Sequence, residues 1–557
     1  MNSQARKNAE DFLNLEKQFH LGFLPTEQSN PLTVNLDKEF ERGSVFGVKN
    51  LQSADRNVLT MAKRVLASEK FCKLADEIYN TISSGKKVVF SGCGATGRLS
   101  ILLESMYREC CAKNPALANY SNRVFSIMTG GDYALVRAVE FFEDYQSFGR
   151  QQVKELEMSA GDMLVAITEG GETSSVLGTL FEALDRGCKG FLLFNNPADL
   201  LAEHLERSRK AITDERVCVL DLSCGPMALA GSTRMQATTS EQLIAGAALE
   251  IAVCRLLNVQ APDHAVLFEE LLNELESEKS VQAIADYIEF EADCCGNGNL
   301  LTYFANDYLL DIFTDTTERT PTFKLPPFRK CDDTTSARPW AFVKNPLYPT
   351  CELWEKSFRR PLRCLEWSEE LYVAMDAPEK ICNNLPRINV DELLKFPVGS
   401  EMIEDRIVSD KDAAVLVTLS SGDDNAALFK AFDKVKQLFP IVKKLSIGAG
   451  TGDFTVECKL LKSPLELMSH MAVKLVLNTA STGIMVRLGR VTGNWMSFVD
   501  VTNKKLIDRA IRLISSIGKI TYEESCYKLF DAIEKLQNMA DGDPEKLPVV
   551  QYVLRRL

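Results

Sequence analysis

Short apolar runs and longer amphipathic stretches alternate along the first half of the chain. The short runs predict strands, and the stretches between them repeat apolar residues at helical spacing, for example over Thr173–Leu184. A longer amphipathic stretch, Thr238–Leu257, ends this unit. Alternation of this kind predicts a parallel sheet with helices on both faces. The predicted strands are Lys86–Phe90, Val124–Met128, Met163–Thr168, Phe191–Phe194 and Val217–Leu222.

A second unit of the same kind begins beyond the acidic segment Phe268–Ser280. From Ser463 to the end the pattern is helical throughout, so the chain is expected to be α/β with a helical C-terminal part. The polar, proline-rich segment Thr314–Lys330 fits either a loop at a second pseudo-site or a contact between domains. The strands predicted for this unit are Leu300–Ala305, Ala413–Gly422, Lys443–Gly448 and Phe454–Leu460.

Composition and charge restrict the class of protein. A chain of 557 residues is too long for one hydrophobic core. Its net charge of -13, without a dense Lys/Arg patch, argues against nucleic acid as a partner. The polar N-terminus and the lack of a long apolar run predict a cytoplasmic protein without a membrane partner. The 16 cysteines and 4 histidines lack the spacing of a metal site, so no metal is expected.

The segment Ser91–Ser100, SGCGATGRLS, joins a predicted strand to a predicted helix. Glycines at such a turn let backbone N–H groups approach an anion. A dinucleotide site needs an acidic residue about 20 residues later. Asp132 comes later than that, inside its own glycine turn, so a small phosphorylated metabolite is favoured over a dinucleotide. Polar turns at Thr168–Ser175 and Gly231–Met235 should converge on the same edge of the sheet.

Five stretches together resemble the sugar-isomerase (SIS) phosphosugar-binding domain. They are SGCGATGRLS at 91–100, TGGDYALVRAVEFFED at 129–144, GGETSS at 170–175, NNP at 195–197 and GSTRM at 231–235. The resemblance is to the branch that joins bacterial N-acetylmuramic acid 6-phosphate etherases with animal glucokinase regulatory protein. Two further stretches, Thr26–Asp37 and Lys474–Ala510, support it.

Because the etherases are dimers of about half this length, the resemblance implies a tandem duplication. The expected fold is two doubly wound parallel-sheet SIS domains, a pseudo-dimer, with a helical C-terminal cap. The implied divisions are an N-terminal segment at 1–45, a first SIS domain at 46–275, a second and degenerate SIS domain at 276–462, and the cap at 463–557.

The resemblance also implies the site residues and one composite site per chain. The family lysine is absent from the first copy, which reads Gln242-Leu243-Ile244, and is present in the second copy as Lys474. The ligand is expected to be a phosphorylated hexose or amino-sugar derivative, with no cofactor. The implied contacts are Gly92, Gly94, Ala95, Thr96, Gly97, Arg98, Gly130, Gly131, Glu140, Glu143, Gly171, Thr173, Ser174, Ser232, Thr233, Arg234 and Lys474.

The activity depends on two glutamates that the etherases use to remove lactate. Elimination needs a base for the C2 proton and an acid for the leaving group. One glutamate corresponds to Glu143, but the other, in a family stretch Asp-Ala-Ser-Glu, falls on Met106 in an ungapped alignment. Glu104 lies two residues earlier, rotated by roughly 200° around the helix, so it is not an equivalent.

Three functions follow from this resemblance. The loss at Met106 favours a metabolite-sensing regulator similar to glucokinase regulatory protein, with a sugar kinase as a candidate partner. The alternative is an etherase-like lyase with Glu143 as its acid or base. A second alternative is a phosphosugar isomerase, because Gly-Gly-Glu172-Thr is closer to the isomerase motif. The sequence names neither the sugar nor the oligomeric state.

Overall fold

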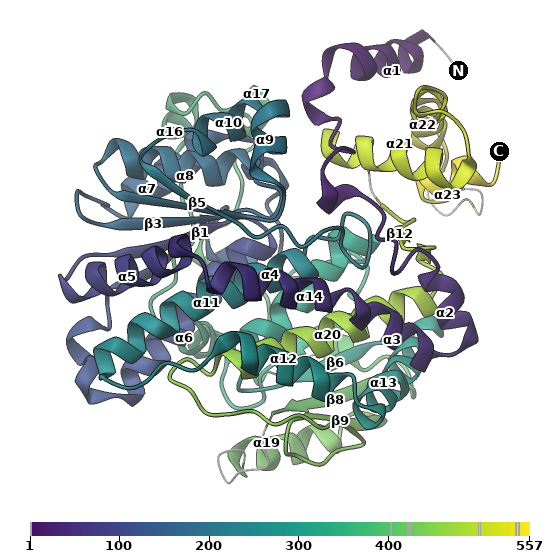
Figure 1. Cartoon of the computed structure of the whole chain (residues 1–557). Helices are drawn as coiled ribbons and strands as arrows, with labels where there is room; N and C mark the ends of the chain where they lie inside the picture. The colour runs from purple at the N-terminus through teal and green to yellow at the C-terminus, as the bar shows by residue number, and fades with distance from the viewer. Residues whose placement is uncertain are drawn as a thin grey trace.

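Two parallel sheets form the framework of the protein, as predicted, and each has five strands (Figure 1). The computed structural model describes residues 3–401, 404–419, 426–499, 501, 503–540, 543 and 546–557. The first sheet has the strand order β2-β1-β3-β4-β5. Its strands are β1 (Val88–Gly92), β2 (Val124–Met128), β3 (Met163–Ile167), β4 (Lys189–Phe194) and β5 (Val217–Asp221).

Helices cover both faces of the first sheet, as expected for parallel strands joined by crossover connections. Short 3₁₀ segments η4 (Asp132–Leu135) and η5 (Glu140–Asp144) follow β2. The helices are α4 (Asp55–Leu66), α5 (Glu69–Ser83), α6 (Ala95–Lys113), α7 (Gln146–Glu155), α8 (Ser174–Asp185), α9 (Ala198–His204), α10 (Glu206–Ile212) and α11 (Gln236–Leu257).

The second sheet repeats the topology of the first. Read from its far edge, its order is β7-β6-β8-β9-β10, so β6 takes the place of β1 and the following helix α14 (Leu309–Phe323) takes the place of α6. The fold is therefore α/β with two doubly wound parallel sheets in tandem. The strands are β6 (Leu301–Phe304), β7 (Ala341–Lys344), β8 (Ala413–Thr418), β9 (Ile441–Ile447) and β10 (Phe454–Val456).

Of the remaining helices of the second half, α13 and α19 pack on this sheet, whereas α12 packs on α4 and α20 (Leu467–Arg487), α15 on α6, and α18 on η4. Helices α16 and α17 pack on each other, and Tyr372 of α16 contacts Phe148 of α7. The helices are α12 (His264–Leu275), α13 (Glu278–Gly296), α15 (Thr350–Phe358), α16 (Glu369–Ala374), α17 (Glu379–Cys382), α18 (Val390–Leu394) and α19 (Ala426–Lys436).

A central helix, α20 (Leu467–Arg487), runs between the two sheets (Figure 1). It packs against α11, α13 and α14. Its residues from Leu467 to Val486 are buried, as expected for a helix that is apolar or small on every side. The two halves therefore meet through four helices, α6, α11, α14 and α20.

The two ends of the chain form the cap. The N-terminal helix α1 (Ser3–Leu15) packs on α22 (Tyr522–Gln537), and both termini lie at this end of the molecule (Figure 1). The cap also contains α21 (Lys504–Gly518) and α23 (Val549–Leu554). Between the cap and the core lie α2 (Leu36–Arg42) and α3 (Ser44–Ser53).

Three sequence predictions need correction or restriction. Strand β7 was not predicted. The prediction of helix throughout from Ser463 is wrong at β11 (Val491–Thr492) and β12 (Trp495–Met496), which pair antiparallel around a Gly493-Asn494 turn. Gly493 has a φ of 58°, which suits such a turn. Residues 420–422 of the predicted strand Ala413–Gly422 lie outside the described residues.

A buried ion-pair network fixes part of the second half to the first. After α15 the chain crosses over, and Arg360 donates to Asp132 (2.7 and 2.8 Å) and to Glu104 (3.0 Å). Arg363 donates to Glu104 as well (2.5 Å). Burial alone would raise the pKa of Glu104, but Arg360, Arg363 and Arg108 lower it to about 2. Glu104 is thus a structural anion that holds the two halves together.

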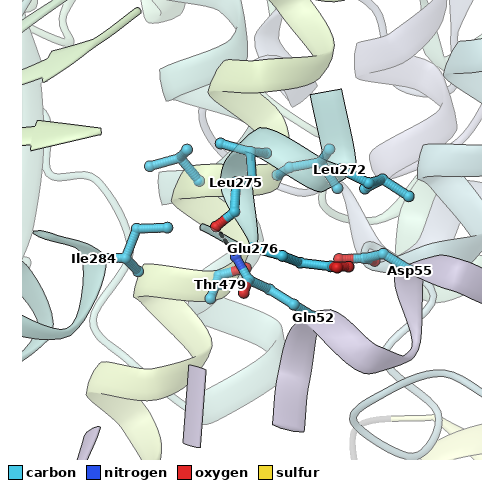
Figure 2. Close-up of a pocket in the computed structure, with 9 residues that line it drawn as sticks. Gln52, Asp55, Leu272, Leu275, Glu276, Ile284 and Thr479 are labelled. Carbon is cyan, nitrogen blue, oxygen red and sulfur yellow. Dashed lines mark hydrogen bonds between the residues drawn. The ribbon is translucent and has the colours of Figure 1, made fainter. Parts of the chain in front are cut away.

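A second buried carboxylate lies at a small cavity between α3, α4, α12 and α20, which Figure 2 shows. Asp55 and Glu276 face each other across it, and Gln52 donates to the Leu275 carbonyl (3.0 Å). Asp55 also accepts a hydrogen bond from Gln236 (2.8 Å). Burial raises the pKa of Asp55 to about 7, with a smaller contribution from Glu276. This carboxyl is therefore largely protonated in the folded protein at moderately acidic pH.

Asp55 should make the protein less stable as the pH rises. The folded carboxyl keeps its proton to about pH 7, whereas an unfolded aspartate loses it near 3.8. The folded state thus binds more protons in this window, and the free energy of unfolding falls as the pH rises through it. Asp55→Asn should remove this decrease and stabilise the protein at pH 8 by up to about 4 kcal/mol. Denaturant unfolding at pH 5 and pH 8 measures the effect.

The exposed residue Asp410 provides the control, because Asp410→Asn should change stability by less than about 0.5 kcal/mol at either pH. An Asp55→Asn variant that is no more stable than the parent at pH 8 would contradict the prediction.

Candidate functional site

The glycine-containing loop Gly92–Arg98 lies at the carboxyl end of β1, where α6 begins. Gly94 has a φ of 56°, a conformation that a side chain would strain. The Thr96 hydroxyl accepts from the Cys93 N–H (3.0 Å) and donates to the Cys93 carbonyl (2.8 Å). Thr96 therefore holds the loop in shape, while Gly97 and Ala95 form the first turn of α6 beside it.

The second loop, between β3 and α8, brings a helix N-terminus to the same edge of the sheet. Ser174 is the first residue of α8 and is half-buried. The hydroxyl of Thr173 is 2.9 Å from that of Thr168, and Gly171 turns the chain with a φ of 77°. Free N–H groups and the helix dipole at this position favour an anion such as phosphate.

Two carboxyl groups with unusual pKa values face these loops. Glu143, on η5, has its Oε2 4.0 Å from the sulfur of Cys93. Burial raises the pKa of Glu143 to about 7, and Lys505 opposes this only in part. Burial also raises the pKa of Glu169 to about 7. Perturbed carboxyls beside an anion-binding loop are typical of catalytic sites. The side chain of Glu140 lies outside the described residues.

The second half contributes a glutamate that the sequence did not identify. Glu318 of α14 forms an ion pair with Arg98, and its Oε1 lies 4.0 Å from the place where a Cβ on Gly94 would be. Helix α14 is the counterpart of α6, and residues 315–318 read Asp-Thr-Thr-Glu, similar to the family stretch Asp-Ala-Ser-Glu. The signal lay inside Thr314–Lys330, the segment that the sequence left open.

Met106, on α6, is buried in the core and 3% exposed. The equivalent helix of the other half, α14, carries Glu318. Glu104 cannot act in its place because it is bound to three arginines.

The GSTRM loop and Lys474 lie at the interface of the halves. Arg234 pairs with Asp315 (2.9 Å) and donates to the hydroxyls of Ser481 (3.1 Å) and Thr482 (2.8 Å). Lys474 donates to the Arg234 carbonyl (2.7 Å) and to Asn478 (2.9 Å). Burial lowers the pKa of Lys474 to about 8.

The two hydroxyl residues of this loop differ in their surroundings. Thr233 is half-buried at the loop, just before α11. The Ser232 hydroxyl is buried and has no hydrogen-bond partner among the described residues. It is therefore the GSTRM hydroxyl with a free hydrogen-bonding capacity.

Gly130 and Gly131 lie beneath the crossing segment from the second half. A Cβ on Gly131 would come within 2.9 Å of the Arg363 carbonyl oxygen, and a Cβ on Gly130 within 3.0 Å of Val139. Asp132 donates its N–H to the same Arg363 carbonyl (3.0 Å). Gly131 thus has a packing role between the halves, whereas Gly130 packs within the first half.

Helix α21 of the cap makes ion pairs next to the second loop. Lys505 of α21 lies 3.4 Å from Glu172, which is also paired with Arg207. Arg509 and Arg512 of the same helix bind Glu27 (2.7 and 2.8 Å), and these pairs lower the pKa of Glu27 to about 2 against the effect of burial. Lys505 is a site residue that the sequence analysis missed, although it lies in a stretch that supported the resemblance.

An aromatic cluster from both halves supports the segment that carries Glu143. Trp367 of the crossing segment stacks on Phe142, with ring centroids 5.6 Å apart, and contacts Phe148 at 5.7 Å. Tyr372 of α16 also packs on both phenylalanines. Because Phe142 is adjacent to Glu143, the second half helps to set the position of this carboxyl.

Among the described residues, no three His, Cys, Asp or Glu side chains are grouped closely enough to hold a metal ion. No helix in the described part of the chain has the length and apolar character needed to cross a membrane.

The part of the chain that contains the glycine loop and the start of α8 matches the model of a known protein family. Residues 70–184, which include the glycine loop, η5 and the start of α8, match the family model of the glucokinase regulatory protein N-terminal SIS domain. This part of the chain is similar to a SIS domain. The resemblance drawn from the loops is thereby confirmed at the level of this family.

Curated relatives of this chain include etherases. N-acetylmuramic acid 6-phosphate etherase 1 of Bacillus licheniformis is 28% identical over 225 residues, covering 40% of this chain and 67% of the relative. N-acetylmuramic acid 6-phosphate etherase of Yersinia pestis is 29% identical over 224 residues, covering 40% and 68%.

Two of the solved structures that are similar to this chain in backbone fold are an isomerase and a domain of an aminotransferase. Tagatose-6-phosphate ketose/aldose isomerase from Escherichia coli has a TM-score of 0.45 at 9% identity, covering 80% of this chain and 94% of its own. The C-terminal domain of glucosamine-fructose-6-phosphate aminotransferase from Francisella tularensis has a TM-score of 0.45 at 11% identity, covering 80% and 97%.

Removing the Trp367 ring should loosen the Glu143 segment. Large-to-small changes at buried aromatic residues cost about 3–5 kcal/mol. If the substitution lowers the free energy of local opening by about 3 kcal/mol, the backbone amides of residues 139–148 should exchange about a hundredfold faster in Trp367→Ala. Hydrogen exchange followed by mass spectrometry measures this, with Trp367→Phe expected to restore most of the protection.

The central helix α20 supplies the internal reference, and its exchange should not change. Equal acceleration over the whole chain, or none at 139–148, would refute a local supporting role of Trp367.

Proposed function

We propose that this protein binds a phosphorylated amino sugar at the composite site and cleaves its lactyl ether, as an N-acetylmuramic acid 6-phosphate etherase does. The observation that carries the proposal is Glu318, which supplies a second carboxylate to a glycine loop that already faces Glu143. The etherase alternative was weakened by the lack of this carboxylate at position 106 and by Glu172, where the etherases carry arginine. The curated relatives favour the same activity.

The phosphate would lie between the glycine loop and the start of α8. Backbone N–H groups, the Ser174 hydroxyl and the helix dipole would bind it without a metal ion. Lys505, which the pair with Glu172 keeps charged by raising its pKa, would add a positive charge at the cap side. The ring would then extend toward Glu143 and Glu318.

The two glutamates suit different proton transfers. Glu318, which forms an ion pair with Arg98 beside the glycine loop, would act as the base for the C2 proton. Glu143, with a pKa of about 7, holds a proton in a large fraction of molecules at neutral pH. It can therefore protonate the ether oxygen as that bond breaks and lactate leaves. Water then adds to the unsaturated sugar, and the two residues return to their starting states.

A regulator is the second candidate, and one observation favours it. The matching family model is that of glucokinase regulatory protein. In this case the same loops would bind a sugar phosphate without turnover, and a ligand between the halves would shift their arrangement for a partner such as a sugar kinase. An isomerase is less well supported, because Glu172 is occupied by Arg207 and Lys505.

Lactate release from N-acetylmuramic acid 6-phosphate tests the proposal. The parent protein should release lactate, and Glu143→Gln and Glu318→Gln should each lower the rate at least about a hundredfold, since each loses a positioned acid or base. The exposed residue Glu203 is the matched control, and Glu203→Gln should behave as the parent. Saturable binding of the sugar without lactate release would instead support the regulator.

The pH dependence tests the two roles separately. If Glu143 is the acid, kcat should fall tenfold per pH unit above about 7, as its proton is lost. If Glu143 were the base, kcat would rise through the same window. A pH profile from 5.5 to 9 distinguishes the two, and a rise would contradict the assignment.

A further inference from the structure

A separate pocket opens between the four helices at the interface of the halves. Leu99 and Leu102 of α6 form one wall, and Gln242 of α11 and Lys474 of α20 face it. Glu318 also lines this pocket and lies beside the glycine loop. The pocket is therefore next to the place proposed for the sugar ring, on the side of Glu318 away from the phosphate.

Hydrogen-bond donors in this pocket lack partners. The Nε2 of Gln242 and the Nε of Arg234 have no hydrogen-bond partner among the described residues, and each side chain is only 3% exposed. A buried polar group without a partner costs about 1–3 kcal/mol. Lys474 donates to two acceptors, which leaves one of its three hydrogens for another group. These donors indicate a ligand that accepts hydrogen bonds.

The acidic side chains of the pocket are already neutralised. Asp315 accepts from Arg234 and Asn478 at one oxygen and from Arg319 at the other. Asp311 is paired with His470 at 2.8 Å, and this pair raises the pKa of the imidazole against the effect of burial. Glu318 is paired with Arg98. The groups of the pocket that remain free to bind a ligand are thus positively charged or hydrogen-bond donors.

We propose that this pocket binds the carboxylate of an ether substituent on the phosphosugar. Gln242, Arg234 and Lys474 would contact the carboxylate, and the leucine wall would contact a methyl group, so a lactyl group fits the chemistry. The free space is about 20 Å³, so the side chains of Lys474 and Gln242 must move apart on binding. The inference rests on the proposed function. It adds that this pocket lets the protein select a lactyl-substituted sugar over other hexose phosphates.

Binding titrations in the Glu143→Gln background, where turnover is expected to be blocked, test the pocket. N-acetylmuramic acid 6-phosphate should bind at least tenfold more tightly than N-acetylglucosamine 6-phosphate, which lacks the lactyl group. Gln242→Met should reduce the affinity for the lactyl sugar about tenfold, the effect of about 1.4 kcal/mol, and leave the other sugar unchanged. Gln242→Glu should reduce it further by charge repulsion, again for the lactyl sugar alone.

Gln152 offers a matched control, because it is a buried glutamine outside the pocket. Gln152→Met should leave the ratio of the two affinities unchanged.

Equal affinity for both sugars, or equal losses in Gln242→Met, would overturn the pocket assignment. If the parent protein still releases lactate in that case, the lyase function stands alone. A preference for the lactyl sugar that depends on Gln242, without turnover by the parent, would retain the pocket and reject the lyase. Failure of both sugars to bind would reject both.

Discussion

The ion pair between Arg98 and Glu318 is the interaction on which the composite site depends. Arg98 is 2% exposed, and a buried guanidinium is costly unless it is paired and hydrogen-bonded. Its other donors reach the carbonyls of Leu135 and Ala134, each at 2.9 Å. One side chain thus fixes the start of α6, the turn after β2 and the helix α14 of the other half. The ion pair that joins the two halves therefore also brings Glu318 to the glycine loop and completes the site.

The second half has lost the glycine loop of the first but still determines its chemistry. It supplies Glu318 to the loop, Lys474 to the pocket, and the Trp367 segment that supports η5. The network around Glu104 attaches that segment far from the second sheet. A duplicated chain that needs only one site can keep the second copy for these contributions.

The sequence predicted the parts of the structure that depend on local pattern. Parallel strands buried on both faces read as continuous apolar runs, which is why β1 to β5 were found within a few residues. Strand β7 was missed because it has four residues and follows a long polar segment. The glycine loop and the α8 turn could be found because each is a short stretch with a direct physical role. Helix α14 was left open because its threonines and Pro321 obscure the helical pattern, although Pro321 lies near its end.

Glu318 could not be predicted from local pattern, because it is 220 residues from Arg98 along the chain. The unpaired donors of the pocket also depend on which partners the fold supplies. The most direct measurement is a crystal structure of the Glu143→Gln variant with N-acetylmuramic acid 6-phosphate bound. The account predicts the phosphate at the start of α8 and the sugar ring between residues 143 and 318. A sugar that contacts the first half alone, with residue 318 turned away from it, would contradict the composite site.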